Sequence, residues 1–217
     1  KAGIPLVGGT GDGGKVSVNG TVYEDADVYA FVKNNGGKVA VYKENLYKPM
    51  PGYRFIASNT DRSRYYVGEL NGKSSKQAYM DALHISESNI INQTFHNPLG
   101  KMNGQDICII SLKEVSGNGL CCYRQVNDSD VLVLLEEQDY NEILDETLQR
   151  IRRDFNHISG VFSINCVFRY LLFSQEHHME DYLKTMSTLG EHAGLIGFGE
   201  HYNQQFVNQT MTCVVFE

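Results

Sequence analysis

The N-terminal quarter of the chain alternates hydrophobic and polar residues over short stretches, with glycine and asparagine between them. Residues 16–18 and 21–23 flank Asn19-Gly20, the dipeptide most typical of a two-residue hairpin. Residues 28–32 and 38–42 flank a second turn that is rich in asparagine and glycine. The pattern therefore predicts two hairpins before the proline-containing segment at residues 48–52.

The middle of the chain also shows short predicted strands separated by turns. Residues 53–57 and 65–70 read as strands, and a short helix follows them around Tyr79. Residues 107–112 and 120–126 are predicted to pair through a glycine-containing turn. The continuous apolar run at residues 131–135 is typical of a strand that is covered on both faces.

The helical periodicity is clearest near the C-terminal third. Leu144, Leu148, Ile151 and Phe155 recur at i, i+4, i+7 and i+11, which predicts a helix over residues 139–155 with one apolar stripe. A second long helix is predicted over residues 176–192. Three strands complete the chain, over residues 160–166, 195–200 and 211–216. We therefore expect an α+β fold with largely antiparallel sheets, hairpins and two long helices.

Composition and charge narrow the possible functions. The chain has 217 residues, 41% of them apolar, and a formal charge of −7. Nucleic-acid binding and docking on anionic lipid both need a basic face, so we expect neither. The longest apolar stretch, residues 160–173, contains Asn165 and Arg169, and we expect no membrane insertion. Five cysteines without disulfide-like spacing favour a reducing, cytoplasmic setting.

Two familiar kinds of site are not expected. Residues 9–15 fit parts of the dinucleotide and Walker A fingerprints, but both need a helix directly afterwards, and a hairpin is predicted instead. The seven histidines and five cysteines show none of the usual metal-ligand spacings. We therefore predict no cofactor and no metal.

Two segments carry polar groups into apolar surroundings. Cys166 and Arg169 lie at the end of a predicted buried strand, where a guanidinium needs a carboxylate or carbonyl partner. That partner is either an internal carboxylate or the acid group of a ligand. A later apolar strand contains Gly197 and Gly199, and Glu200 places a carboxylate directly after them. This pattern suits either a bulge with a surface glutamate or the close approach of another group to the backbone.

These segments, in this order, resemble the FIST family, named for F-box and intracellular signal transduction proteins. Its C-terminal part has a Cys-x-x-Arg motif at a strand end, then a Gly-x-Gly-Glu strand, then an Asn-x-Thr segment before the closing strand. Cys166 and Arg169 match the first motif, Gly197, Gly199 and Glu200 the second, and Asn208 and Thr210 the third. Phe168 departs from the family, which often has a glycine there.

The resemblance implies a division into the tail of the family's N-terminal region, residues 1–50, and its C-terminal region, residues 51–217. Most of the N-terminal region is missing, which is consistent with a fragment of a longer protein. The resemblance further implies a cytoplasmic sensory module, found in bacteria, that binds a small ligand such as an amino acid and acts on a signalling output domain or partner protein.

Arg169 and Glu200 are complementary to the carboxylate and the ammonium of such a ligand. We expect them to converge on one cleft with Cys166, Gly197, Gly199, Asn208 and Thr210. Two alternatives stay open. One is an enzyme with Cys166 as the nucleophile, whose base would have to come from the fold. The other is an interaction scaffold without a ligand, which should show an exposed apolar patch rather than a polar cleft.

Overall fold

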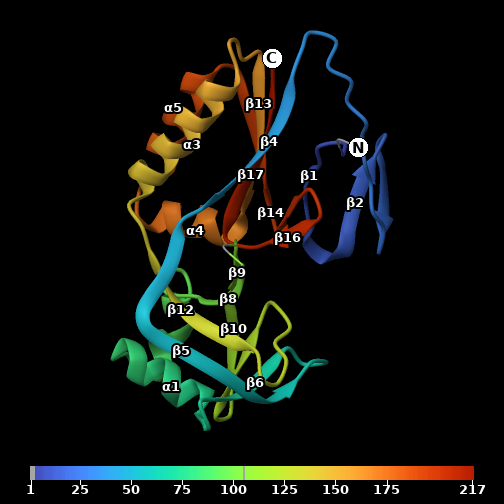
Figure 1. Ribbon diagram of the computed structural model, residues 1–217. Coiled ribbons are helices and arrows are strands. Elements are labelled where there is room, and N and C mark those ends of the chain that lie inside the picture. Colours follow the sequence, from blue (N-terminus) through green and yellow to red (C-terminus); the bar gives the residue numbers. More distant parts are fainter. Residues whose placement is uncertain (1–2, 105) are drawn as a thin grey trace. The chain divides into compact units, whose positions relative to one another are not determined.

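The computed structural model describes residues 3–104 and 106–217, and the chain forms two compact units (Figure 1). One unit comprises Lys1–Leu46 together with Asp139–Glu217, and the other comprises Tyr47–Gln138. The second unit is thus inserted into the sequence of the first. The fold is mixed α+β with mostly antiparallel sheets, as the sequence pattern predicts.

The first unit holds the predicted site. Its elements are, in chain order, β1 (Val7–Gly9), η1 (Asp12–Gly14), β2 (Lys15–Val18), β3 (Thr21–Glu24), β4 (Val39–Asn45), α3 (Tyr140–Asp154), β13 (Gly160–Cys166), α4 (Val167–Gln175), α5 (Met179–Met186), η3 (Ser187–Leu189), β14 (His192–Gly197), β15 (Glu200–Tyr202), β16 (Gln205–Val207) and β17 (Thr210–Phe216).

A four-stranded sheet in the order β14-β13-β17-β4 forms the centre of this unit. β13 pairs in parallel with β14, and the other neighbours are antiparallel. A parallel pair needs a crossover connection, which α4 and α5 supply here. The helices lie along one side of the sheet in Figure 1. β1, β15 and β16 form a separate three-stranded sheet, and β2 and β3 form a hairpin.

Strand alternation assigns the two faces of the central sheet. Ser163 and Asn165 of β13 contact the side where the helices pack, because Asn165 bonds to Tyr182 of α5. Ile164 points the other way and meets Gly9 of β1. The face of the sheet opposite the helices therefore receives the N-terminal strand.

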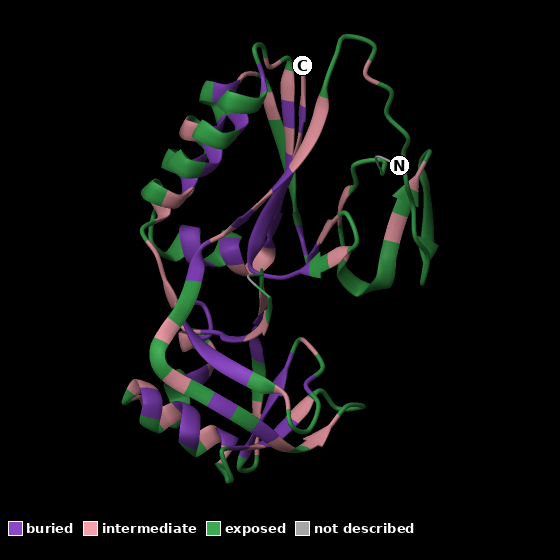
Figure 2. Ribbon diagram, in the orientation of Figure 1, coloured by how far each residue is buried: buried purple, intermediate pink, exposed green. Residues whose placement is uncertain are grey.

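The helix over residues 139–155 is confirmed. α3 begins after Asp139, whose carboxylate accepts hydrogen bonds from the amides of Asn141 and Glu142 at 2.9 and 3.0 Å. Leu144, Leu148 and Ile151 are buried along one side of it. Figure 2 shows this side of α3 buried and the other side exposed.

The prediction of a second long helix over residues 176–192 is wrong in its extent. His177 adopts a left-handed conformation, with φ 56°, and separates α4 from α5. α5 covers only Met179–Met186, and the strand β14 already begins at His192. Leu183 of α5 is exposed. The hydrophobic pattern did not predict α4, because the residues at its start resemble the end of a buried strand.

The expected strand over residues 28–32 is also wrong. No strand is assigned there, and Tyr29 and Phe31 are 79% and 81% exposed. A strand needs a hydrogen-bonding neighbour, and none of the described residues provides one to this segment. By contrast, the hairpin at Asn19-Gly20 is confirmed, with both residues at positive φ. That hairpin follows residues 9–15 directly, where a nucleotide-binding loop would require a helix.

The second unit is a curved antiparallel sheet in the order β10-β11-β6-β5-β12-β8-β9, with β7 beside β6. Its elements are β5 (Tyr47–Asp61), β6 (Tyr66–Leu70), β7 (Lys73–Ser74), α1 (Ser75–Leu83), η2 (Glu87–Asn89), α2 (Ile90–Gln93), β8 (Leu99–Asn103), β9 (Asp106–Ile110), β10 (Leu112–Ser116), β11 (Gly119–Cys122) and β12 (Val131–Glu137). Residues 48–52 lie inside β5, so the proline segment is part of a strand.

The core of the second unit lies between this sheet and α1. Leu132 and Leu134 of β12 are buried there, together with Tyr79 and Ala82 of α1. The predicted strand over residues 131–135 is confirmed. The predicted pairing of residues 107–112 with 120–126 holds only from Leu112 onward, because β9 pairs with β8 instead.

Candidate ligand-binding site

The carboxyl end of β13 leads directly into α4, and Cys166 lies at this junction. It is the last residue of the strand and the N-cap of the helix. Its thiol is buried and is hydrogen-bonded by the backbone amides of Phe168 and Gln209. Burial raises the pKa of the thiol to about 12, and the neighbouring Glu200 contributes in the same direction. Cys166 is therefore a protonated thiol at neutral pH.

Glu200 is a fully buried carboxyl group beside this junction. It begins β15, and its Oε2 accepts hydrogen bonds from the hydroxyl and the backbone amide of Thr210, at 2.8 and 3.3 Å. Burial raises the pKa of Glu200 to about 7, while the Thr210 bonds and the charge of Arg169 act against this rise. Glu200 is thus a buried group that can gain or lose a proton near neutral pH.

Arg169 is the largest fully buried side chain of the described residues. It projects from the first turn of α4, and its Nη2 donates to Oε1 of Glu44 on β4. The guanidinium carbon lies 4.7 Å from the ring centre of Phe173 and 5.3 Å from that of Tyr182. The internal carboxylate partner that the sequence left open is therefore Glu44.

Two further polar side chains accompany this ion pair. Nδ2 of Asn165 donates to the hydroxyl of Tyr182 at 3.0 Å, and both residues are buried. Sequence reasoning singled out neither Glu44 nor Tyr182. For Glu44 the sequence did contain a signal. Glu44 lies two residues after Tyr42 in the same strand, so both side chains point to the same, buried face of the sheet.

The glycines of the Gly197–Glu200 segment are crowded by the chain itself. A Cβ on Gly197 would lie 3.4 Å from Cα of Gly9 and 3.5 Å from a methyl group of Ile164. A Cβ on Gly199 would lie 2.5 Å from Cζ of Phe206, and Gly199 has φ +120°. The close approach that these glycines allow is therefore that of β1 and β16.

The structure gathers Cys166, Arg169, Glu200 and Thr210 at one end of β13. Cys166 and Thr210 contact Glu200 directly, and Arg169 influences it electrostatically. Gly197 and Gly199 shape the adjoining backbone. Asn208 is buried, with its Oδ1 only 3.1 Å from the position a Cβ on Gly199 would take.

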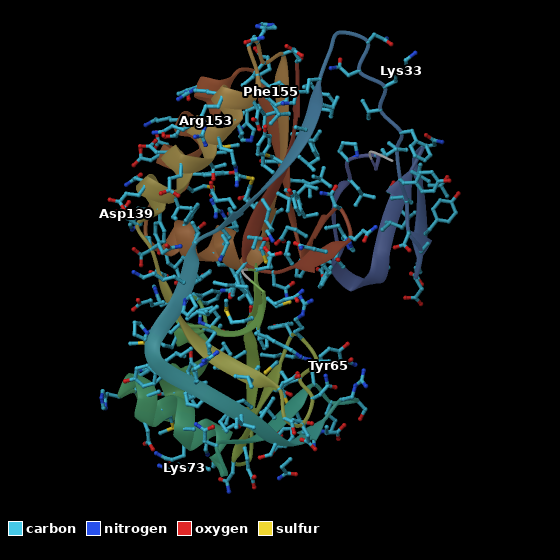
Figure 3. The ribbon with its side chains drawn as sticks, viewed as in Figure 1. Lys33, Tyr65, Lys73, Asp139, Arg153 and Phe155 are labelled. Carbon is cyan, nitrogen blue, oxygen red and sulfur yellow. The ribbon has the colours of Figure 1, made fainter. Side chains whose placement is uncertain are left out.

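A pocket of about 450 Å³ opens between β4 and α3 in the same unit. Glu44 forms part of its wall together with Asn45, Glu146, Thr147, Arg150 and Arg153. Figure 3 labels Asp139, which lies directly before α3, and Arg153 in its last turn. Glu44 therefore belongs both to the pocket and to the buried ion pair with Arg169.

The model of the FIST C domain family matches residues 76–203, more than half of the chain. The chain belongs to this family. FIST domains are signal-transduction sensory modules. The matched segment includes Cys166, Arg169 and Glu200, whereas Asn208 and Thr210 lie beyond it. No curated protein and no solved structure matches the chain.

Among residues 3–104 and 106–217, no helix is long and apolar enough to cross a membrane. Within the same residues, no group of three or more His, Cys, Asp or Glu side chains is arranged to hold a metal ion.

Proposed function

We propose that this FIST domain binds a small ligand that carries both a carboxylate and an ammonium group, such as an amino acid. We further propose that it reports binding to a signalling output domain or partner protein in the cytoplasm of a bacterial cell. The five free cysteines of the described chain support a reducing compartment.

The observation that carries this proposal is a set of buried polar atoms without hydrogen-bond partners among the described residues. Nε and Nη1 of Arg169 are unused donors. Oε2 of Glu44, Oδ1 of Asn165 and Oε1 of Glu200 are unused acceptors. A buried polar atom without a partner costs about 1–3 kcal/mol, so such a set calls for an additional partner.

The chemistry of these atoms matches a zwitterion. The unused donors of the Arg169 guanidinium, Nε and Nη1, suit carboxylate oxygens, which accept charge-assisted hydrogen bonds. The acceptors on Glu44, Asn165 and Glu200 suit an ammonium group, which has three donors and no acceptor. The ion pair of Arg169 with Glu44 keeps both charges compatible with burial while the ligand is absent.

The same geometry favours binding over catalysis by Cys166. A nucleophilic cysteine needs a thiolate, and the pKa of about 12 keeps Cys166 protonated. Its side-chain neighbour is the carboxyl of Glu200, whose negative charge raises the thiol pKa further. We therefore propose a role in ligand contact or packing for this residue, and no enzymatic activity.

The proposal is tested by calorimetric titration of the chain with the common amino acids and small carboxylates. Glu200→Gln keeps an oxygen for the Thr210 bonds but removes the charge, so it should lower ligand affinity at least tenfold without lowering the apo melting temperature. Lys184→Ala serves as a control, because its pair with Glu180 is exposed. Wild-type protein that binds none of these ligands would contradict the proposal.

Arg169 needs a paired design, because removal of one partner of a buried ion pair costs about 3–5 kcal/mol by itself. The double variant Arg169→Met with Glu44→Met replaces both charges by apolar groups of similar length. We expect it to regain most of the stability lost in Arg169→Met and to bind no ligand. A double variant that binds as tightly as wild type would assign the pair a purely structural role.

A further inference from the structure

A chain of hydrogen bonds leads from the edge of the central sheet to the buried residues around Arg169. It begins at His192, the first residue of the edge strand β14, whose side chain is half-buried. Nε2 of His192 lies 2.9 Å from Oγ of Ser163 on β13. Ser163 is hydrogen-bonded in turn to the hydroxyl of Tyr182, which accepts from Nδ2 of Asn165 at 3.0 Å. The chain therefore connects a partly exposed imidazole with a buried amide.

The register of β13 and β14 explains why these side chains meet. The two strands run parallel, with Val161 opposite His192 and Ser163 opposite Gly194. Side chains two residues apart on a strand share a face, so His192 lies on the same face as Ser163 and Asn165, where the helices pack. A Cβ on Gly194 would lie 2.6 Å from Oγ of Ser163. The glycine therefore leaves room for the hydroxyl that His192 contacts.

The bonds of this chain all run in one direction, because each hydroxyl has a single proton to donate. Nδ2 of Asn165 donates to Tyr182, so Tyr182 donates to Ser163, and Ser163 donates to Nε2 of His192. This direction requires Nε2 to be an acceptor, so a neutral His192 carries its proton on Nδ1. Burial lowers the pKa of His192 below its usual 6.5, which keeps the ring neutral at neutral pH.

Protonation of His192 reverses the direction of the chain. Nε2 then becomes a donor, so Ser163 directs its proton to Tyr182, and Tyr182 directs its proton to Asn165. The amide can accept this proton only through Oδ1, which requires the end of the side chain to turn over. Oδ1 of Asn165 has no hydrogen-bond partner among the described residues, so no bond to this oxygen opposes the rotation.

The charged groups near His192 are largely paired. β14 packs against β13 and α4, and α5 lies over the same face of the sheet. Arg169 of α4 pairs with Glu44, and Lys184 of α5 pairs with Glu180. Among the described residues no charge adds to the effect of burial on the pKa of His192. Besides Tyr182, the remaining titratable residues of these elements and of the turn before β14 are Cys166, Tyr170, Asp181 and Glu191.

The contact between Ser163 and His192 also resembles that of a nucleophile and its base. Ser163 is only 1% exposed, however, and its hydroxyl is bonded to Tyr182 as well as to His192. A nucleophile needs space for a substrate beside its oxygen, which a buried hydroxyl bonded on both sides does not offer. The geometry therefore suits a relay of hydrogen bonds rather than catalysis.

We infer that His192 is a positioning residue whose protonation state sets the orientation of the Asn165 amide. Neutral His192 leaves the oxygen of the amide free, and protonated His192 leaves its NH₂ group free. The effect on a ligand rests on the proposed function, in which this oxygen accepts from an ammonium group. Acidification then weakens ligand binding through Asn165, and by linkage the bound ligand opposes protonation of His192.

The test follows side-chain NMR signals of the chain without ligand from pH 5 to 8. It uses the Glu200→Gln background, so that the titration of Glu200 does not contribute. The ring signals of His192 should move with a midpoint below 6.5, and the NH₂ signals of Asn165 should move with the same midpoint. Ser163→Ala interrupts the chain, so it should abolish the movement of the Asn165 signals while His192 still titrates.

His157→Gln is the matched control, because His157 is an exposed histidine of the same unit. It should leave the titration of the Asn165 signals unchanged. His192→Gln removes the titrating group itself, so the Asn165 signals should then stay constant from pH 5 to 8. This variant carries the test if Ser163→Ala does not fold, as judged by its melting curve.

The outcomes separate this inference from the proposed function. Asn165 signals that stay constant while His192 titrates would overturn the inference, whether or not the chain binds an amino acid. A movement of the Asn165 signals that persists in Ser163→Ala or in His192→Gln would also overturn it. Failure of every amino acid to bind would overturn the proposed function and leave the coupling of His192 to Asn165 standing.

Discussion

At the scale of single residues, the environment of Glu200 combines burial with a few well-placed donors. Thr210 supplies two hydrogen bonds to one carboxyl oxygen, and Arg169 adds a positive charge nearby. These effects do not offset the loss of water, so the pKa of Glu200 rises from 4.5 to about 7. The folded state therefore holds this proton more tightly than the unfolded chain does.

This difference predicts how stability depends on pH. Between about pH 4.5 and 7 the folded state binds more protons at Glu200 than the unfolded state, so the free energy of unfolding should fall as pH rises. The loss should amount to at most about 3 kcal/mol, and Glu200→Gln should lack it. Urea titrations of both proteins at pH 5, 6, 7 and 8 measure the difference.

Glu180→Gln is the control for this experiment. The pKa of Glu180 is lowered by Lys184, so its titration ends below this pH window. Its curve should run parallel to that of wild type from pH 5 to 8. Parallel curves for Glu200→Gln as well would mean that Glu200 is ionised throughout the window, contrary to the expected pKa.

At the scale of elements, the turn between β14 and β15 depends on glycine for its geometry. Gly199 has φ +120°, its carbonyl accepts from the amide of Thr10 at 2.9 Å, and the amide of Phe198 donates to the carbonyl of Thr10 at 2.9 Å. These bonds attach the end of β1 to the turn that precedes Glu200. The position of Glu200 therefore depends on a backbone conformation that L side chains rarely adopt.

Gly199→Ala should consequently destabilise the first unit more than an equivalent change in an open turn. The new Cβ would lie 2.5 Å from Cζ of Phe206 and 3.1 Å from Oδ1 of Asn208, so these neighbours must shift, and the backbone strain itself costs about 1–3 kcal/mol. Gly72→Ala is the comparison, since Gly72 also has positive φ but no heavy atom within 4 Å of the added Cβ. Chemical denaturation of both variants measures the difference.

Phe206→Leu in the Gly199→Ala background provides a further check. It shortens the side chain that the new methyl group meets, so it should restore part of the lost stability. Equal destabilisation by Gly199→Ala and Gly72→Ala would show that crowding by Phe206 contributes nothing.

At the scale of the whole molecule, the inserted unit Tyr47–Gln138 has its own sheet and its own core. Its two ends are adjacent, because Tyr47 of β5 pairs with Glu137 of β12. A segment whose ends meet and whose strands pair among themselves satisfies the usual conditions for an independent domain.

We therefore predict that residues 47–138 fold when expressed alone. Urea denaturation followed by circular dichroism should show a single cooperative transition. Leu134→Ala should lower the stability of this segment by about 2–5 kcal/mol, because Leu134 is fully buried in its core. A gradual transition that Leu134→Ala does not shift would indicate a collapsed chain without specific packing.

Several features depend only on local interactions, and the sequence pattern predicted them correctly. The Asn19-Gly20 hairpin forms because both residues tolerate positive φ, and α3 forms where four apolar residues share one face and an aspartate caps the start. The strand over residues 131–135 likewise follows from its composition. In each case the deciding interactions lie within a few residues of one another, so the sequence pattern contains them.

Features that depend on distant partners were decided only by the tertiary structure. The segment at residues 28–32 has the alternation of a strand but no neighbour to pair with among the described residues. The sequence identified Cys166, Arg169, Glu200 and Thr210 as candidates, but the carboxylate that meets Arg169 is Glu44, 125 residues away. The pairing of these two charges arises because β17 brings β4 into the same sheet as β13, and strand order is a non-local property that periodicity does not encode.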